Sequence, residues 1–507
     1  MTNLYDLLSQ NFPADRDQTV LETPDGESMS YADLEAGSGR IARLLMDCGV
    51  QPGDRVAAQI EKSPQAILLY LAVLRCGGVY LPLNTAYKGG EVAYFLEDAE
   101  PRVLVCDPTS ESILQATADK AGVGTVLTLG EDGNGSLMER SRDLDPDAGI
   151  VARDTDDLAA ILYTSGTTGR SKGAMLSHGN LGSNTLTLRD AWGFTADDVL
   201  IHALPVFHTH GLFVATHCVL LSGSRMLFLN RFDADTVIDL LPRATAMMGV
   251  PTFYTRLLAS PRLTKEVCAG IRLFVSGSAP LLSETFKEFE ARTGHRILER
   301  YGMTETTMNT SNPLNGERIA GTVGFPLTGI EVRITDEDGK ALPQGEVGVL
   351  EVKGPNVFRG YWRQPDKTAA EIRPDGCFIT GDLSMIDERG YIHIVGRSKD
   401  LIISGGFNVY PKEVELCIDE IDGVQESAVI GVPHPDFGEA VVAVVKRQGG
   451  GPDVSADTIQ STAKAALANF KVPKKVFFVE DLPRNTMGKV QKNLLRDRFK
   501  DSFSSAA

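Results

Sequence analysis

The stretch that decides the fold is Thr164-Ser165-Gly166-Thr167-Thr168-Gly169-Arg170-Ser171-Lys172-Gly173. It follows residues 158–163 (LAAILY), a short apolar run that predicts a buried strand. Glycines let a backbone approach a phosphate closely, hydroxyls and amides donate hydrogen bonds to it, and Lys172 adds a positive charge. The sequence therefore predicts a phosphate-binding loop directly after a buried strand.

This loop differs from the phosphate loop of the P-loop NTPases. Their motif is Gly-x4-Gly-Lys-Ser/Thr, and it opens a helix. Here Lys172 precedes Gly173, and residues 174–177 that follow are typical of a strand. A polar hairpin turn is the alternative interpretation, but the concentration of hydroxyls, glycines and a lysine favours a phosphate site.

The chain on either side of the loop alternates helical and extended patterns. Residues 31–48 and 64–75 have the apolar spacing of helices, while residues 54–59 and 79–83 are typical of strands. Residues 130–136 (GEDGNGS) predict a surface loop. The alternation resumes at residue 158 and continues past residue 301. We therefore expect an α/β fold, with a mostly parallel sheet covered by helices.

The pattern changes near Gly329. Short strands are predicted at residues 331–335, 349–352 and 391–394, with turn residues between them, as in antiparallel sheets. After residue 400 a compact unit is predicted, with a helix at residues 411–419 and strands at 426–432 and 441–445. We place a domain boundary at residues 397–400, which gives a large domain (1–397) with a β-rich subdomain and a small α+β domain (398–507).

Composition excludes some classes of function. The chain has 507 residues, 42% of them hydrophobic, which is enough for more than one buried core. The net charge is −17 and long basic runs are absent from the sequence, so we expect no nucleic-acid partner. Residues 1–12 lack the features of a secretory signal, and residues 66–74, the most apolar stretch, are too short to span a bilayer. Seven dispersed cysteines suggest reduced thiols and the cytoplasm.

The loop YTSGTTGRSKG (residues 163–173) resembles the signature of the adenylate-forming superfamily, which includes acyl-CoA synthetases, luciferases and peptide-synthetase adenylation domains. Four further motifs of that family follow in the family's order. They are YGMTE (301–305), TGDL (380–383), GRSKD with SGG (396–400 and 404–406) and PRNTMGK (483–489). The resemblance spans nearly the whole chain and implies a large N-terminal domain with a small, mobile C-terminal one.

The resemblance implies roles for individual residues. Acyl activation joins a carboxylate oxygen to the α-phosphorus of ATP and expels pyrophosphate, so cations and donors must hold the phosphates. Glu305 is the expected Mg²⁺ ligand with help from Thr164, and Asp382 is expected to bind the ribose beside Arg397. The other residues expected to hold ATP are Thr164, Ser165, Gly166, Thr167, Thr168, Gly169, Lys172, Gly277, Ser278, Ala279, Glu299, Arg300, Tyr301 and Lys489.

The resemblance makes Lys489 the catalytic lysine, which would bridge the attacking carboxylate and the α-phosphate. A thiol must then reach the acyl carbon, and the family achieves this by rotating the small domain about a hinge that maps to Lys399. The rotation would bring Gly405 and Gly406 to the tunnel for CoA, although these glycines could equally form a plain turn. Lys489 is also a candidate target of an acetyltransferase and a deacetylase, as in related synthetases.

Three segments lie where the family builds its acyl pocket: residues 202–212, 250–256 and 276–280. The three histidines of the first segment suggest a metal site, but the sequence nearby offers no further ligand to complete it. Arg256 follows an apolar run, so we expect it to point inward, where a guanidinium suits a substrate carboxylate. A structural or surface role for Arg256 is the alternative.

Four stretches resemble the malonyl-CoA synthetases within the family: LPLNTAY (81–87), GVPTFYTRLL (249–258), ERYGMTET (299–306) and GGFNVYPKEVE (405–415). That subfamily activates malonate and often methylmalonate with ATP and CoA, releasing AMP and pyrophosphate. The resemblance implies that Arg256 meets the carboxylate that does not react, with His208 and Ser278 as further donors.

Other functions remain open on the sequence alone. A synthetase for a monocarboxylic aliphatic or aromatic acid is the main alternative. A luciferase or a domain that loads a carrier protein would share the first half-reaction. A nucleotide-binding regulator without turnover belongs to a different class, and the intact Glu305, Asp382 and Lys489 argue against it.

Overall fold

The computed structural model describes residues 3–164, 171–279, 281, 283–336, 338–397, 402–409, 411–449, 451–483 and 490–503. The chain divides into two compact units. The larger unit comprises residues 1–85, 93–162 and 173–396, and the smaller unit comprises residues 86–92, 163–172 and 397–507. Within the described parts of the chain, no helix combines the length and apolarity needed to cross a membrane.

The larger unit contains a nine-stranded sheet, in the order β15-β14-β13-β12-β11-β9-β10-β1-β2. Strands β1, β10, β9, β11, β12 and β13 pair in parallel, whereas β2, β14 and β15 pair antiparallel at the two edges. The strands span Thr19–Glu22 (β1), Ser28–Ser30 (β2), Val199–His202 (β9), Arg225–Phe228 (β10), Ala246–Gly249 (β11), Leu273–Ser276 (β12), Leu298–Met303 (β13), Thr307–Ser311 (β14) and Phe325–Pro326 (β15).

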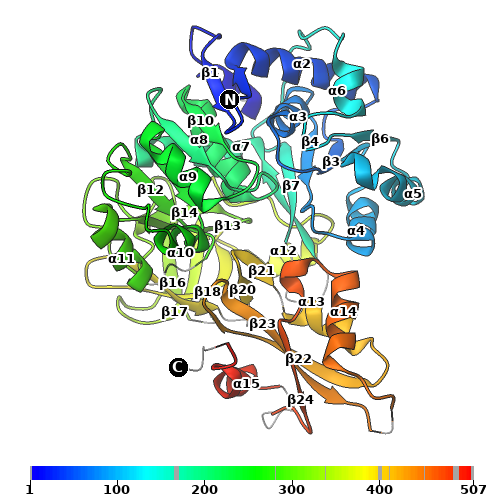
Figure 1. The fold of residues 1–507 in the computed structure, drawn as a ribbon, viewed down its shortest axis with the longest axis vertical. Helices are drawn as coiled ribbons and strands as arrows, with labels where there is room; N and C mark the ends of the chain where they lie inside the picture. The colour runs from blue at the N-terminus through cyan, green and yellow to red at the C-terminus, as the bar shows by residue number, and fades with distance from the viewer. Residues whose placement is uncertain are drawn as a thin grey trace. The chain divides into compact units, whose positions relative to one another are not determined.

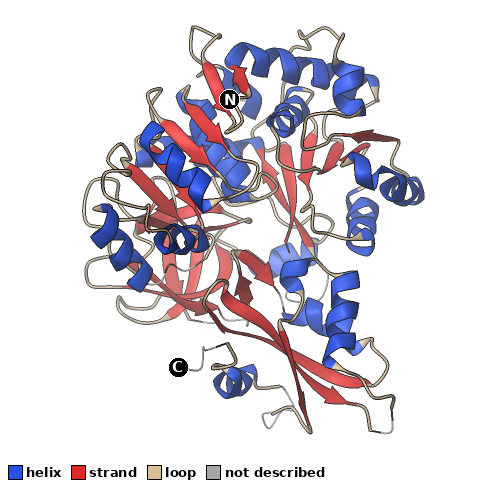
Figure 2. Ribbon diagram, viewed as in Figure 1, coloured by secondary structure: helices blue, strands red, loops and turns tan. Residues whose placement is uncertain are grey.

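A second sheet has six strands in the order β6-β5-β3-β4-β7-β8, and Figure 2 shows helices beside the strands of both sheets. Its strands span Arg55–Gln59 (β3), Val79–Pro82 (β4), Val103–Cys106 (β5), Thr125–Thr128 (β6), Leu158–Thr164 (β7) and Lys172–Ser177 (β8). Helix α3 packs on β4, and α5 packs on β5 and β6 (Figure 1). The parallel α/β architecture predicted from the alternating pattern is thereby confirmed.

Local sequence sets where the helices begin. Helix α2 (Tyr31–Asp47) starts at Ser30, whose hydroxyl accepts from the amide of Asp33 while the Asp33 carboxylate accepts from the amide of Ser30. Helix α3 (Pro64–Arg75) starts after Ser63, with proline at its first position. The other helices of this part of the chain are α1 (Leu4–Ser9), α4 (Gly89–Ala99), α5 (Glu111–Ala121), α6 (Ser136–Ser141), α7 (His178–Trp192), α8 (His217–Ser222), α9 (Ala234–Leu240), α10 (Pro251–Ala259), α11 (Ser283–Thr293) and α12 (Pro365–Glu371).

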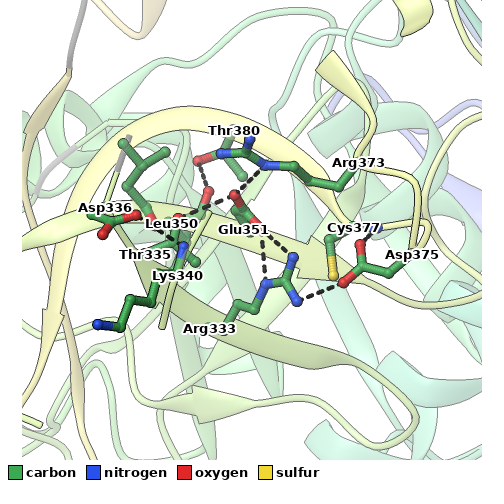
Figure 3. A network of polar contacts seen from close by, with 11 residues as sticks. Arg333, Thr335, Asp336, Lys340, Leu350, Glu351, Arg373, Asp375, Cys377 and Thr380 are labelled. Carbon is green, nitrogen blue, oxygen red and sulfur yellow. Dashed lines mark hydrogen bonds and ion pairs between the residues drawn. The ribbon is translucent and has the colours of Figure 1, made fainter. Parts of the chain in front are cut away.

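A four-stranded sheet, β16-β17-β18-β19, forms the β-rich part predicted after Gly329. Its strands span Glu331–Thr335 (β16), Gly348–Lys353 (β17), Phe378–Ile386 (β18) and Ile392–Arg397 (β19). Glu351 of β17 is fully buried, and its two carboxylate oxygens accept hydrogen bonds from Arg333 at 2.8 Å and Arg373 at 2.8 Å (Figure 3). Asp375 completes the network by pairing with Arg333 at 2.6 Å. Four charges thus neutralise one another across this sheet.

The smaller unit has its own sheet and helices. Strands β20 (Ile402–Ser404), β21 (Phe407–Val409), β22 (Val424–His434) and β23 (Gly438–Arg447) pair antiparallel, and β24 (Lys475–Val479) joins β23 in parallel. The long paired strands β22 and β23 are visible in red in Figure 2. The helices of this unit are α13 (Pro411–Asp419), α14 (Ala456–Ala466) and α15 (Lys492–Phe499).

The division of the chain is less simple than the predicted boundary. The larger unit ends at Gly396, but residues 86–92 and 163–172, which we had placed in the large domain, cluster with the smaller unit. Lys471 shows why the first of these segments does so. Its buried ammonium lies 3.0 Å from Glu91 and 2.8 Å from Glu413, and 4.8 Å from the centre of the Tyr87 ring. The two-domain boundary remains our proposal.

Candidate functional site

The phosphate loop joins two neighbouring strands of the six-stranded sheet. Thr164 is the last residue of β7, and Lys172 is the first residue of β8 and is buried. Both predicted strands are thereby confirmed. Ser165, Gly166, Thr167, Thr168 and Gly169 lie outside the described residues, so their role as phosphate ligands stays a prediction.

Parallel strand ends bring the three predicted pocket segments to one edge of the nine-stranded sheet. His202, the last residue of β9, is in register with Met248 of β11. The next residue of β11, Gly249, is in register with Ser276, which is the last residue of β12. Residues 203–209, 250–256 and 277–279 therefore leave the sheet at the same edge. Ligands of open α/β sheets bind beyond the carboxyl ends of the strands.

The hairpin of β13 and β14 carries four further candidates. Glu299, Arg300 and Tyr301 lie on β13, and Glu305 lies in the turn before β14. The Tyr301 hydroxyl donates to a carboxylate oxygen of Asp382 on β18, at 2.5 Å. Two residues predicted to frame the adenosine, 81 positions apart, therefore meet within the larger unit.

Glu305 is a buried carboxylate held in place by a tyrosine. The Tyr361 hydroxyl lies 3.1 Å from one oxygen of Glu305 and 2.7 Å from one oxygen of Glu371. Lys367 pairs with Glu371 at 2.7 Å, and burial, followed by the two carboxylates, raises the pKa of Tyr361. A preoriented carboxylate of this kind suits a hard cation.

The described residues contain no cluster of three or more His, Cys, Asp and Glu side chains that could hold a metal by themselves. Mg²⁺ bound with a nucleotide usually takes only one or two carboxylates and completes its shell with phosphate oxygens and water. Glu305 fits that arrangement. The histidines of residues 202–212 are not part of such a cluster among the described residues.

His208, His210 and Ser278 form a polar cluster at the edge of the sheet. The amide of His210 donates to Nδ1 of His208 at 3.2 Å, and Nδ1 of His210 lies 3.3 Å from the hydroxyl of Ser278. Burial, together with the charge of Arg300, lowers the pKa of His208 to about 4 and that of His210 well below its usual value. Both rings are therefore neutral at pH 7. Since Nδ1 of His208 accepts a hydrogen bond, its Nε2 carries the hydrogen and can donate.

Arg300 is the buried cation of this cluster. The described residues provide no hydrogen-bond partner for its Nε and Nη2 atoms. A Cβ atom at Gly277 would lie 2.3 Å from the guanidinium carbon, so a glycine is needed there. Burial lowers the pKa of Arg300 to about 9, which still leaves it charged at pH 7. A buried guanidinium with unused donors is suited to bind an anion.

The prediction that Arg256 points inward is wrong for this structure, because its side chain is exposed. Helix α10 explains the exposure. Tyr254, Leu257 and Leu258 form its buried face, and Arg256 lies two residues after Tyr254, on the opposite face. The pattern of the helix could have revealed this. Contact of Arg256 with a substrate stays a proposal.

The remaining candidates belong to the last part of the chain. Gly405 and Gly406 form the turn between β20 and β21 with φ of +59° and +81°, a backbone conformation that favours glycine. Arg397 ends β19, but its side chain is not among those described. Lys399 and Lys489 lie outside the described residues, so the hinge and the catalytic lysine remain predictions.

Comparison with known proteins adds independent information. Residues 9–362 match the AMP-binding enzymes, and residues 413–489 match the AMP-binding enzyme C-terminal domain. ATP-bound MatB from Rhodopseudomonas palustris is 59% identical, with a TM-score of 0.79, over 99% of this chain and 100% of that one. A malonyl-CoA ligase solved with methylmalonyl-CoA and AMP is 35% identical, with a TM-score of 0.81, over 95% of this chain and 100% of that one. A feruloyl-CoA synthase from an Amycolatopsis species is 35% identical over 94% of each protein.

Proposed function

The chain belongs to the AMP-binding enzymes as an AMP-forming CoA ligase, and we propose that the acid it activates is malonate, with methylmalonate as a second substrate. The observation that carries the proposal is the buried Arg300, whose Nε and Nη2 lack partners among the described residues beside the neutral His208 and His210. Similarity to a malonyl-CoA ligase supports the same choice.

The charge of the substrate explains why this observation matters. When one carboxylate of malonate reacts, the other stays ionised and must enter the site. Burying an unpaired charge is very costly, so a dicarboxylate site needs a cation within it. The unused Nε and Nη2 donors of Arg300 match the two oxygens of a carboxylate, and Nε2 of His208 can donate a further hydrogen bond. Arg256, whose side chain is exposed, is the second candidate.

The reaction has two balanced half-reactions. In the first, a carboxylate oxygen of the acid bonds to the α-phosphorus of ATP while the bond to pyrophosphate breaks. In the second, the thiolate of CoA bonds to the acyl carbon and AMP leaves, while the thiol proton passes to solvent. We assign Lys489 to the first half-reaction, where its ammonium offsets the charge on the pentavalent phosphorus.

We assign the nucleotide contacts to residues of the family motifs. Asp382, which accepts a hydrogen bond from the Tyr301 hydroxyl, would accept hydrogen bonds from the ribose. Glu305, oriented by Tyr361, would hold Mg²⁺ with Thr164. Mg²⁺ supplies positive charge to the phosphate oxygens when it is bound. Lys172 and residues 164–169 would hold the phosphates themselves.

A monocarboxylic acid is the alternative substrate. A feruloyl-CoA synthase is 35% identical to this chain, the same share as the malonyl-CoA ligase, so identity to these two relatives does not separate the substrates. Such an acid would leave Arg300 buried without a counter-charge. The dicarboxylate therefore agrees better with this site.

Release of pyrophosphate from ATP, measured with malonate as the only acid, tests the proposal. We expect release that depends on malonate and sustained turnover only when CoA is present. Ferulate and propionate serve as matched acids without a second carboxylate. Pyrophosphate release that is faster with either of them than with malonate would overturn the assignment of malonate and leave the ligase activity standing.

A further inference from the structure

Lys62 is a buried lysine outside the residues assigned so far. It lies between β3 of the six-stranded sheet and α3, and only 6% of its surface is exposed. Its ammonium donates to the carbonyl of His202 at 2.8 Å and lies 3.0 Å from Nδ1 of the same residue. It also lies 4.1 Å from the centre of the Phe228 ring. Lys62 thus connects the loop after β3 of the six-stranded sheet with the end of β9 in the nine-stranded sheet.

The partners of His202 fix its tautomer. Nε2 of His202 lies 2.9 Å from the carbonyl of Gly211, which can only accept, so Nε2 carries the hydrogen. Nδ1 therefore accepts, and Lys62 is its donor. Thr216 adds to the contact between His202 and Gly211, because its hydroxyl donates to the carbonyl of Gly211 at 3.0 Å and lies 3.1 Å from Nε2 of His202.

These contacts close the base of one loop. Residues 203–210 leave the sheet after His202. The chain comes back into contact with His202 at Gly211, in the π-helix η2 (His210–Thr216). The two arms of the loop are in close contact, since a Cβ atom at Gly211 would lie 2.1 Å from the carbonyl oxygen of Pro205. The loop carries His208 and His210, whose pKa values are lowered by burial and by the charge of Arg300. Movement at its base would displace these imidazoles.

We propose that Lys62 is a positioning residue for the acyl pocket, which acts through His202 and Gly211 to hold the loop that carries His208 and His210. The inference rests on the proposed function in one respect, namely that this loop contacts the acid. The lysine is not explained as part of an ion pair, since no carboxylate of the described residues lies within pairing distance of it. Burial also lowers the pKa of Lys62, which agrees with a role as a hydrogen-bond donor to neutral groups.

Lys62→Met tests the proposal. Methionine keeps the unbranched stem and removes the donors, and because Lys62 has no acidic partner, no carboxylate is left unpaired. Loss of a buried hydrogen-bond donor predicts that KM for the acid rises by roughly 5- to 100-fold. KM for ATP should change by less than about twofold, because the contacts of Tyr301 and Asp382 do not involve this loop. Lys120→Met, at an exposed lysine of α5, is the matched control and should change neither constant.

A second variant, at Thr216, tests the contact between His202 and Gly211. Thr216→Val is nearly isosteric and removes the hydroxyl that donates to Gly211. If both residues hold one loop, Lys62→Met combined with Thr216→Val should raise KM for the acid by less than the product of the two single effects. A purely multiplicative result would show two independent structural roles and overturn the inference.

Hydrogen–deuterium exchange gives a readout that does not depend on the choice of acid. Faster exchange in residues 203–212 of Lys62→Met, with unchanged exchange in residues 103–106 and 125–128 of β5 and β6, supports the inference. Unchanged exchange at residues 203–212, or a parallel rise in KM for acid and ATP, would overturn it. If the wild-type enzyme prefers another acid, the kinetics are repeated with that acid, so the inference can stand while the assignment of malonate fails.

Discussion

Arg300 provides the most informative single substitution. Arg300→Met removes the buried cation while keeping an unbranched side chain that fills much of the same space. Removing one partner of a buried ion pair costs about 3–5 kcal/mol, which corresponds to roughly a 10²- to 10³-fold or greater loss of kcat/KM. We therefore expect malonate activity to fall by that factor. Propionate has no second carboxylate to pair, so its kcat/KM should fall by less than about tenfold.

The same substitution should not destabilise the free enzyme. Nε and Nη2 of Arg300 have no partner among the described residues, and each unsatisfied buried donor costs about 1–3 kcal/mol. Arg300→Met removes these costs, so we expect the melting temperature to stay the same or rise. The buried charge of Arg300 is therefore expected to contribute to binding an anion and not to the stability of the fold.

The assay compares kcat/KM for malonate and propionate, KM for ATP and the melting temperature in wild type, Arg300→Met and Arg256→Met. The account predicts that Arg300→Met changes the preference between the acids and leaves KM for ATP within about twofold. A rise in KM for ATP with equal losses of kcat/KM for both acids would show that Arg300 binds ATP, as the family resemblance implies. A change of preference in Arg256→Met alone would assign the carboxylate to Arg256.

Three further predictions concern catalysis and stability. Lys489→Ala should nearly abolish formation of the adenylate from acid and ATP, while thioester formation from preformed acyl-adenylate continues; equal loss in both assays would refute the assigned role. Burial raises the pKa of Glu299 to about 7 from 4.5, so the folded chain keeps a proton that the unfolded chain loses, and stability declines as pH rises through this range. Urea unfolding between about pH 5 and about pH 7.5 should show this decline in wild type and a flatter profile in Glu299→Gln, and parallel profiles would contradict it. Glu351→Gln weakens the pairing with Arg333 and Arg373, which are partly exposed, so the free energy of unfolding should fall by about 3 kcal/mol or less; an unchanged value would show that the network contributes nothing.

Local signals in the sequence were sufficient to predict many elements. The predicted helices at residues 64–75 and 411–419 and the strand at residues 331–335 have the same bounds in the structure. For the first of these helices the cause is local, because the side chain of Ser63 caps it directly before Pro64. The meeting of the three pocket segments was implied only by the family resemblance, and the parallel register of β9, β11 and β12 now gives its physical reason.

Tertiary contacts could not be predicted from the sequence. Lys62 and His202 are 140 positions apart, and nothing in the residues around either one indicates the contact. The burial of Arg300 depends on Gly277, a residue from a different strand end. The apolar run before Arg256 does not imply burial, because the helical period of α10 places that side chain outward.

The most direct test of the account is a competition among acids for limiting CoA. Malonate, methylmalonate, propionate, acetate and ferulate are supplied together at equal concentration with ATP and Mg²⁺, and the thioesters formed are quantified by mass spectrometry. Because product ratios under competition equal ratios of kcat/KM, the assay measures specificity itself. The account predicts that malonyl-CoA predominates, followed by methylmalonyl-CoA. Predominance of propionyl-CoA, acetyl-CoA or feruloyl-CoA would contradict the claim that this site is built for a dicarboxylate.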